Sequence, residues 1–296
     1  MKKMLLVVNP RAGTRKINKS MVDVLSVFNR GGYDVQTYIT AGPHDAEDAA
    51  RLRCGDVDIV VCAGGDGTFN ETLAGVMASG CDVPLGYIPC GSTNDFAASL
   101  KLSTNVLEAA KDIVEGTPQQ YDVGKFDHRY FSYVASFGVF TKTAYSTPQS
   151  VKNALGHTAY LLEGIQELSQ FKTEHVRFEL EDQVIEDDFL FGAVSNSLSV
   201  GGILTLDPKQ VDMTDGKFEL LLVRAPKNLR EVQECLQALQ KQTYNCAMMT
   251  FLSAKKMKVV ASAEMNWTLD GERQDGCEEV LIENLRSAFR MVKRGS

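Results

Sequence analysis

The sequence has few of the residues that build metal clusters or disulfide frameworks. Its 4 histidines are scattered and show neither H-E-x-x-H nor Cys/His spacing, which argues against a zinc site. Its 7 cysteines are odd in number and include no C-x-x-C pair. We therefore expect reduced cysteines in a cytosolic protein.

Long apolar runs and an excess of basic residues are also absent. The longest uncharged stretch, Phe189 to Leu206, is interrupted by serine, asparagine and glycine, so we expect no membrane-spanning helix. The run Met4 to Val8 is shorter than a signal-peptide core and is predicted to be a first β-strand. The net charge of −7 argues against general nucleic-acid binding, which needs a broad basic face.

Two common nucleotide-binding motifs are missing as well. No G-x-x-x-x-G-K run followed by Ser or Thr is present, which disfavours a P-loop enzyme. The dinucleotide pattern G-x-G-x-x-G fails because Asn70 occupies the last glycine position after Gly65-Asp66-Gly67. A hydride-transfer enzyme therefore has little support.

What is present fits an ordinary globular protein of two domains. The 296 residues exceed one typical domain, and 44% apolar with 23% charged residues is a usual mixture. Strand-like and helix-like runs alternate over the first 125 or so residues, which predicts a parallel, doubly wound sheet. The expected strands are Met4–Val8, Val35–Thr40, Asp58–Ala63 and Pro84–Ile88, and the expected helices include Phe69–Ala78 and Val106–Glu115.

The pattern changes to short β-like runs from Gln119 to about Val280, which predicts a β-sandwich. Two helices are expected within it, at Gly156–Phe171 and Leu229–Gln242. We place an α/β nucleotide-binding domain at residues 1–125 and a sandwich domain at 126–282. The C-terminal segment 283–296 is expected to be able to pack back on the first domain.

A glycine-rich turn, Gly64-Gly65-Asp66-Gly67-Thr68, follows the third expected strand and precedes a helix. Open α/β sheets bind ligands at the carboxyl ends of their strands, and glycines there let backbone N–H groups approach phosphates. Asp66 would repel those phosphates unless Mg²⁺ lay between them. Taken alone, the run is also compatible with an ordinary Asp-Gly turn.

Two further polar turns follow other expected strands. Gly91-Ser-Thr-Asn-Asp95 comes after the fourth strand and opens a helix at Phe96, and Asn9-Pro-Arg-Ala-Gly13 comes after the first. The carboxylates of Asp66 and Asp95 are expected to face one crevice. Turns of this kind at three strand ends predict a phosphate-binding site.

These motifs, together with Asp270-Gly-Glu272, resemble the diacylglycerol kinase catalytic-domain family, and most closely its soluble bacterial lipid kinases. The resemblance keeps the same order over essentially the whole chain, although Gly-Gly-Asp-Gly alone is shared with NAD kinases and phosphofructokinases. It implies a Rossmann-like α/β domain and a β-sandwich domain, with ATP in the cleft between them. The implied nucleotide-binding residues are Asn9, Thr40, Gly64, Gly65, Asp66, Gly67, Thr68, Phe69, Asn70 and Thr93.

The same resemblance implies roles for the carboxylates. Asp66 and Asp95 would organise Mg²⁺ and its waters, and Asp122 would extend this network. Glu272 matches the general base, since a carboxylate can accept the proton of the acceptor hydroxyl. In Asp212-Met-Thr-Asp215-Gly-Lys217 the resemblance implies a second Mg²⁺, bound by the Asp215 side chain and by the carbonyls of Asp212 and Lys217. An ordinary Asp-Gly hairpin remains the alternative there.

The leading hypothesis is transfer of the ATP γ-phosphoryl group to a lipid hydroxyl, with diacylglycerol as the first candidate and phosphatidic acid as product. The acceptor pocket is expected to draw on Val134 to Tyr160. The alternatives are a kinase for sphingoid lipids, an NAD kinase, and a catalytically silent nucleotide- or lipid-binding regulator. We expect a cytoplasmic enzyme with transient contact at the inner face of the membrane. Whether it forms a homodimer is left undecided by the sequence. The basic residues Arg11, Arg15, Lys16 and Lys19 form either a solvated loop or a patch that faces phosphates, of a nucleotide or of an anionic bilayer.

Overall fold

The computed structural model describes residues 1–139, 172–200, 204–206, 209–241, 243–244 and 246–295. The helix expected at Gly156–Phe171 lies outside the described residues, as does the part of the expected acceptor pocket from residue 140 on. The other expected helix in the second half is α8 (Leu229–Lys241).

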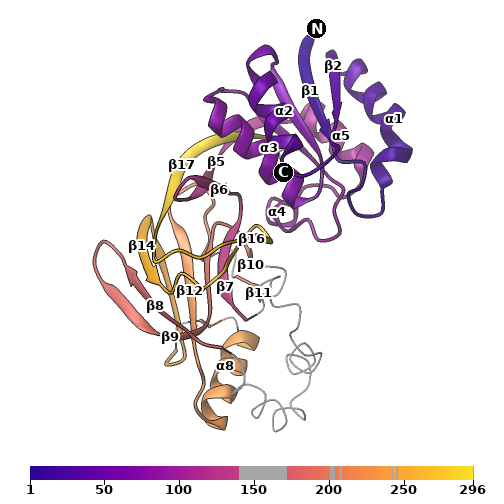
Figure 1. The fold of residues 1–296 in the computed structure, drawn as a ribbon. Coiled ribbons are helices and arrows are strands. Elements are labelled where there is room, and N and C mark those ends of the chain that lie inside the picture. Colours follow the sequence, from indigo (N-terminus) through magenta and orange to yellow (C-terminus); the bar gives the residue numbers. More distant parts are fainter. Residues whose placement is uncertain (140–171, 201–203, 207–208, 242, 245, 296) are drawn as a thin grey trace.

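The N-terminal half is a doubly wound parallel sheet, as predicted. Its strands β1 (Lys2–Val8), β2 (Tyr33–Ile39), β3 (Ile59–Gly64) and β4 (Leu85–Pro89) lie in the order β2-β1-β3-β4. Helices α1 (Lys16–Arg30) and α5 (Val106–Glu115) cover one face, and α2 (Asp45–Arg53) and α3 (Asp66–Ser79) cover the other (Figure 1). The apolar run in β1 is continuous because Leu5 and Val7 enter one core while Met4, Leu6 and Val8 enter the other.

The C-terminal half is built from antiparallel strands around an aromatic core that contains Phe137, Phe178, Phe189 and Trp267. Its strands are β6 (Arg129–Phe131), β7 (Val134–Gly138), β8 (Glu174–Glu179), β9 (Val184–Ser195), β12 (Phe218–Arg224), β13 (Met249–Ala254), β14 (Lys256–Ala261), β15 (Trp267–Leu269) and β16 (Glu272–Gln274). A separate short pair joins β10 (Ser199–Val200) to β11 (Leu204–Thr205). The fold class predicted from sequence is confirmed.

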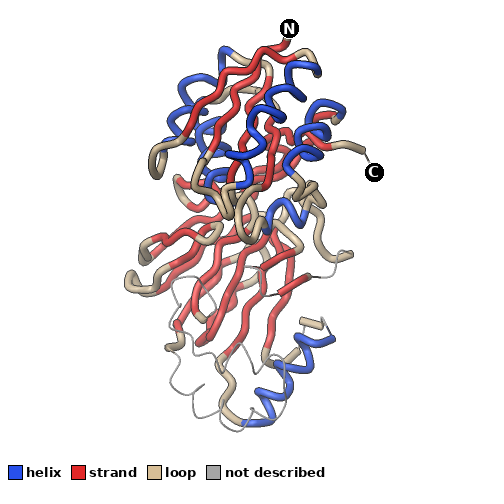
Figure 2. Tube along the Cα trace, turned by 90° about the vertical axis from the view of Figure 1, so that its right-hand side faces the viewer, coloured by secondary structure: helices blue, strands red, loops and turns tan. Residues whose placement is uncertain are grey.

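Two long strands, β5 (Thr117–Phe126) and β17 (Glu279–Lys293), run through both halves. They pair with each other, while β17 also pairs with β14 in the sandwich and, at Met291, with Leu85 of β4. A bulge between Leu285 and Phe289 bends β17 where it passes from one half to the other. The halves are therefore stacked end to end along one continuous sheet (Figures 1 and 2). The sequence pattern predicts neither strand over its full length.

Two helices begin earlier than the sequence pattern indicated. Helix α3 starts at Asp66 rather than Phe69, and α4 (Asp95–Ser99) starts one residue before Phe96. Gly65, in an extended conformation, is the N-cap of α3. An acidic residue is favourable in a first helical turn because it faces unpaired backbone N–H groups.

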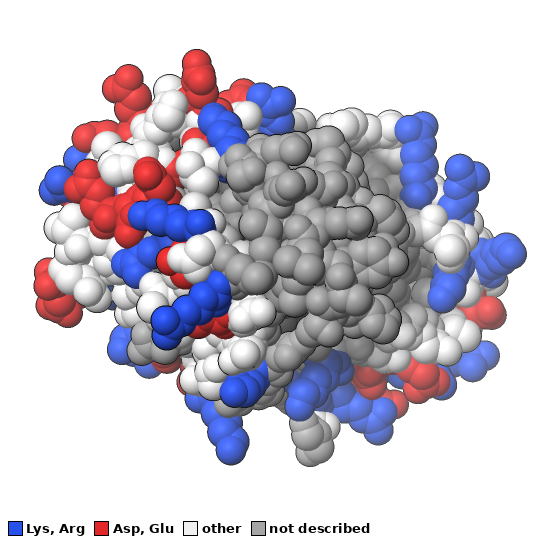
Figure 3. Space-filling view, turned by 90° about the horizontal axis from the view of Figure 1, so that it is seen from below, with Lys and Arg blue, Asp and Glu red and all other residues white. Residues whose placement is uncertain are grey.

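The surface carries mixed charge where it can be seen from the sandwich end of the molecule. On the described part of that face, Lys and Arg side chains are interspersed with Asp and Glu (Figure 3). Within the described ranges, no helix has the combination of length and apolar character that crossing a bilayer requires. All 7 cysteines are free thiols.

Candidate active site

The three polar turns predicted from sequence pack against one another at the carboxyl ends of β1, β3 and β4. Gly13, at φ +48°, packs against the turn that follows β4. A Cβ atom on Gly13 would come within 2.3 Å of the Cys90 carbonyl oxygen. A Cβ atom on Gly91 would be 2.7 Å from the Cα of Gly65. Such contacts leave no room for a side chain, so these glycines are needed to bring the turns together.

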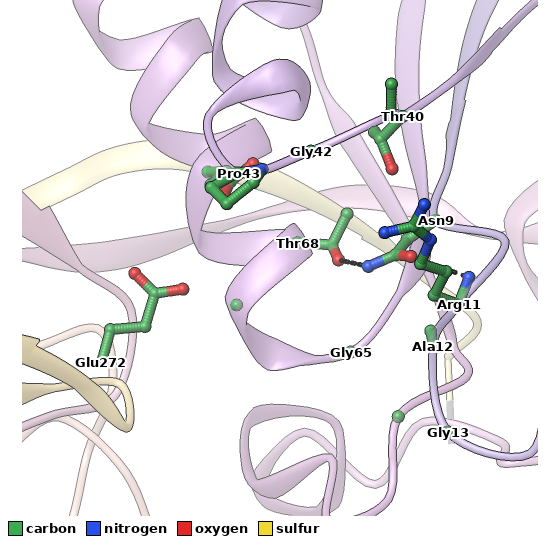
Figure 4. A pocket seen from close by; sticks show the side chains of 14 residues that line it. Asn9, Arg11, Ala12, Gly13, Thr40, Gly42, Pro43, Gly65, Thr68 and Glu272 are labelled. Carbon is green, nitrogen blue, oxygen red and sulfur yellow. Dashed lines mark hydrogen bonds between the residues drawn. The ribbon is translucent and has the colours of Figure 1, made fainter. Parts of the chain in front are cut away.

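Asn9 joins the first turn to helix α3. Its side-chain amide donates a 2.9 Å hydrogen bond to Oγ1 of Thr68, while its Oδ1 accepts from the backbone N–H of Arg11 (Figure 4). The backbone N–H of Asn9 donates to the carbonyl of Ala63 at the end of β3. Strands β1 and β3 and the first turn of α3 are therefore held in one arrangement.

A pocket of about 400 Å³ opens above these turns. The end of β2 and the loop after it form one wall, and Glu272 lies on the other side of the first turn of α3 from Asn9 (Figure 4). The residues that line it are Asn9, Arg11, Ala12, Gly13, Thr40, Ala41, Gly42, Pro43, Gly65, Gly67, Thr68, Glu71, Gly91 and Glu272.

The charge of Asp66 is compensated by the start of α4. Its carboxylate accepts hydrogen bonds from the backbone N–H groups of Asp95, at 3.1 Å, and Phe96, at 3.4 Å. Asp95 itself is buried beside it. Tyr133 is buried too, and desolvation followed by the charges of Asp270, Asp66, Asp95 and Glu272 raises its pKa. This phenol is therefore a neutral group among the site's carboxylates.

Glu272 reaches the α/β half from the sandwich on the β15–β16 hairpin. Leu269 pairs with Glu272, so the hairpin turn is the two residues Asp270 and Gly271, both with positive φ. Turns of that kind match the twist of the strands and fix the register. The hairpin sets Glu272 against α3, since a Cβ atom on Gly67 would be 2.9 Å from Oε1 of Glu272. Arg129 lies beside the same carboxylate, with its Nη2 3.7 Å from Oε2 of Glu272.

Asp270 anchors this hairpin in the protein interior. Its side chain accepts hydrogen bonds of 2.5 to 3.0 Å from the backbone N–H groups of Ser132, Tyr133 and Val134 and from the Ser132 hydroxyl. Burial raises the pKa of Asp270 to about 6, although these hydrogen bonds act in the opposite direction. The orientation of Glu272 thus depends on a carboxylate two positions earlier.

A second cavity, of about 510 Å³, lies beside the Asp212–Lys217 loop. Asp215 Oδ1 accepts from the Lys217 N–H, and the carbonyl of Lys217 accepts from the Asn284 amide. Asp122 holds this loop, because its carboxylate accepts from the Gly216 N–H at 2.6 Å and from the Ser287 N–H at 2.8 Å. Burial raises the pKa of Asp122 despite these bonds.

Glu219 faces the second cavity and was not singled out by the sequence. It is 2% exposed, and its Oε2 has no hydrogen-bond partner among the described residues. Burial, and then the charges of Asp215 and Asp212, raise the pKa of Glu219 to about 8. A cation bound in this loop would offset the free-energy cost of burying the Glu219 charge. The carboxylate and carbonyl oxygens of the loop are the ligands that a hard metal ion prefers.

Not every predicted site residue lines the pocket. Asn9, Thr40, Gly65, Gly67, Thr68 and Glu272 do, whereas Gly64, Asp66, Phe69, Asn70, Thr93 and Asp95 do not. Phe69 is buried and stacks on Phe96, and the Asn70 amide donates to the Tyr130 carbonyl. Thr93 is exposed.

Several residues of the site were missed because their neighbours are distant in sequence. Glu71 lies in α3 just after the predicted glycine-rich turn, and its carboxylate accepts hydrogen bonds from the backbone N–H groups of His44 and Ala46 at the start of α2. Arg129, which lies beside Glu272, carried no sequence signal. The Asp-Gly-Glu motif itself was the available signal for Asp270.

Comparison with known proteins agrees with this architecture. Residues 3–126 match the family model described as diacylglycerol kinase catalytic domain, and residues 134–286 match the YegS C-terminal NAD kinase beta sandwich-like domain. The diacylglycerol kinase of Bacillus subtilis (strain 168) is 31% identical over 276 residues, covering 92% of this chain and 90% of that protein. That of Staphylococcus saprophyticus is 31% identical over 273 residues, covering 92% and 89%. A crystal structure from Bacillus anthracis str. Sterne, provisionally assigned as a diacylglycerol kinase, superposes with a TM-score of 0.80 at 25% identity, covering 99% of this chain and 95% of that one.

The fold and these relatives define the chain as a phosphotransferase of the lipid kinase class, with an alcohol group as acceptor. More specifically, it belongs to the bacterial diacylglycerol kinase family, and both of its halves take part in that relationship.

Proposed function

We propose that the protein transfers the γ-phosphoryl group of ATP to the hydroxyl of diacylglycerol, giving phosphatidic acid. The observation that carries the proposal is the placement of Glu272 against Gly67, at the edge of a pocket built from three glycine turns. A carboxylate at that position can accept the proton of the acceptor hydroxyl, while backbone N–H groups donate hydrogen bonds to the phosphates. The curated relatives named diacylglycerol kinase support this acceptor over others.

The nucleotide would lie over the three turns. Asn9, Thr40, Gly65, Gly67 and Thr68 line the pocket and would contact it directly. Gly64, Asp66, Phe69, Asn70 and Thr93 would act through backbone groups or by supporting these residues. The close packing of Gly13, Gly65 and Gly91 supports this assignment, because phosphate oxygens need backbone without side chains in the way.

Asp66 and Asp95 would hold Mg²⁺, which supplies charge neutralisation at the phosphates. Among the described residues, no group of three or more His, Cys, Asp or Glu side chains is arranged around a metal position. Mg²⁺ commonly takes one or two carboxylates together with substrate phosphates and water. In the second cavity, Asp215 with the carbonyls of Asp212 and Lys217 would hold another cation, and the unpartnered oxygen of buried Glu219 supports it.

The proton of the acceptor hydroxyl would pass to the carboxylate of Glu272. As it does so, the hydroxyl oxygen forms its bond to the γ-phosphorus, and the bond from that phosphorus to the bridging oxygen breaks, releasing ADP. Asp270 holds the hairpin and Arg129 limits the freedom of the Glu272 side chain. The lipid would be reached from the inner face of the membrane by peripheral contact, in which the basic residues before and at the start of α1 would face anionic headgroups, namely Arg11, Arg15, Lys16 and Lys19.

Incubation with labelled ATP and separate diacylglycerol, sphingoid-base and NAD acceptors tests the proposal. We expect label in phosphatidic acid, and we expect Glu272→Gln to lower kcat by about 10²- to 10⁴-fold, since it removes the proton acceptor but keeps the shape. Label only in NAD, or only in a sphingoid base, would overturn the diacylglycerol assignment. No transfer to any acceptor would support a silent regulator, and unchanged turnover by Glu272→Gln would remove Glu272 from the mechanism.

A further inference from the structure

One guanidinium group contacts all three residues of β16. Nη1 of Arg129 donates a 2.7 Å hydrogen bond to Oε1 of Gln274 and a longer one, of 3.5 Å, to the Arg273 carbonyl. Its Nη2 lies 3.7 Å from Oε2 of Glu272. A single side chain from β6 therefore spans the strand that carries the proposed proton acceptor.

The backbone that presents this side chain is fixed. Arg129 pairs with Phe126 across a tight turn, and Phe126 is buried in the sandwich core. Within the turn, Asp127 exchanges two hydrogen bonds with Leu281 of β17, one through its backbone N–H and one through its carboxylate. The guanidinium thus leaves a well-anchored part of the molecule.

Gln274 is anchored as well. It pairs with Trp267, a fully buried residue. Its side-chain amide has a defined orientation, because Nε2 donates a 3.1 Å hydrogen bond to the Asp275 carbonyl while Oε1 accepts from Arg129. The side chain of Arg273 is engaged elsewhere, by the Asp275 carboxylate. The amide oxygen of Gln274 is therefore a fixed acceptor that faces Arg129.

The distances decide which of these contacts orients the guanidinium. At 3.7 Å, the contact with Glu272 is too long for a hydrogen bond. Both side chains are also partly exposed, at 31% for Arg129 and 43% for Glu272, and ion pairs of that kind contribute little by themselves. The short hydrogen bond to Gln274 is therefore the contact that fixes the guanidinium plane and places its charge beside Oε2 of Glu272.

We propose that Gln274 is a positioning residue for phosphoryl transfer, acting through Arg129 on the orientation of Glu272. This inference rests on the proposed role of Glu272 as proton acceptor. With Oε2 drawn to Arg129, Oε1 stays against Gly67, at the pocket. A carboxylate oxygen held there is placed to accept the proton, and an error of about 1 Å in such a position can lower the rate by about 10²-fold.

The test measures kcat and KM for ATP and for diacylglycerol in variants of the whole chain. Gln274→Met keeps the size of the side chain but removes the acceptor, and we expect kcat to fall by about 3- to 30-fold with both KM values unchanged. Gln274→Glu keeps an acceptor oxygen for the guanidinium and should stay within about threefold of the wild type. Gln183→Met is the matched control, because it makes the same replacement at an exposed position between β8 and β9.

Two double variants separate positioning from a general loss of structure. If Gln274 acts through Arg129, Gln274→Met should have no further effect on kcat once Arg129→Ala is present. If Arg129 acts through Glu272, Arg129→Ala should have no further effect in Glu272→Gln, whose proton acceptor is already gone. Thermal melting of each variant reports any loss of folding separately.

A wild-type kcat in Gln274→Met would overturn the inference, as would a loss that persists in Gln274→Glu. An additional loss on adding Arg129→Ala to Glu272→Gln would also overturn it, because the guanidinium would then act on the substrates directly. Failure of the proposed function has a different signature, in which Glu272→Gln turns over like the wild type or the wild type phosphorylates no diacylglycerol.

Discussion

Gly67 illustrates how one residue can serve both halves of the site. It lies in the first turn of α3, where alanine would be preferred by the backbone by about 1 kcal/mol. Its missing side chain instead leaves space for the carboxylate of Glu272, which arrives from the sandwich. The sequence motif is therefore not explained by phosphate binding alone.

Gly67→Ala separates stability from activity. The added Cβ would meet Oε1 of Glu272 at 2.9 Å, so we expect the flexible carboxylate to move and kcat to fall by at least about tenfold. The melting temperature should stay the same or rise, because alanine favours the helix. Gly55→Ala, whose Cβ would meet Cys81 Sγ at an ordinary 3.8 Å, is the control. Full activity in Gly67→Ala would show that the position of Glu272 is not critical.

The β15–β16 hairpin is the element that fixes the direction of Glu272. Its turn uses positive φ at both Asp270 and Gly271, and the Asp270 carboxylate ties it to the segment Ser132–Val134. Two opposing effects act on that carboxylate, since burial disfavours its charge and the N–H donors favour it. Which effect is larger decides how the stability of the hairpin depends on pH.

The raised pKa of Asp270 fixes the sign of that dependence. With a folded-state pKa of about 6 and an ordinary value of 3.8, the folded protein binds the proton more tightly, so this contribution to stability is lost as pH rises from about 4 to 6. Urea unfolding of the wild type and Asp270→Asn at pH 4 and pH 7 measures it. The difference in unfolding free energy should favour the wild type more at pH 4, by at most roughly 3 kcal/mol. A difference that favours it more at pH 7 would mean that the hydrogen bonds outweigh burial.

At the scale of the whole molecule, the two halves share strands and core. Strands β5 and β17 belong to both, and Phe289 of β17 contacts the rings of Phe69, Phe96 and Tyr121. One apolar cluster includes Leu5 of β1 as well as Leu221 of the sandwich. The active-site geometry therefore depends on strands that connect the two halves and are themselves part of the core.

This shared core predicts cooperative unfolding. The chain has 1 tryptophan, Trp267, which is fully buried in the sandwich and reports that half by fluorescence. Every described helix except α8 lies in the α/β half, so the circular dichroism of the described helices reports mainly that half, and we expect both thermal transitions to coincide. Met291→Ala, which truncates a fully buried side chain of β17 beside β4, should destabilise both signals together by about 2–5 kcal/mol. Separate transitions would show that the halves unfold independently.

The sequence by itself determined the alternation of strands and helices, the sandwich, and the turns at Asn9, Gly64 and Gly91. These features are local, because periodicity, glycine and helix-start residues act over a few positions. It could not give the full extent of β5 and β17, since each strand has partners in two halves and no single pattern of burial. The tertiary structure alone decided the contact of Glu272 with Gly67 and the anchoring of Asp270. Each of these depends on backbone N–H groups, burial or glycine gaps supplied by distant parts of the chain, and those exist only after folding.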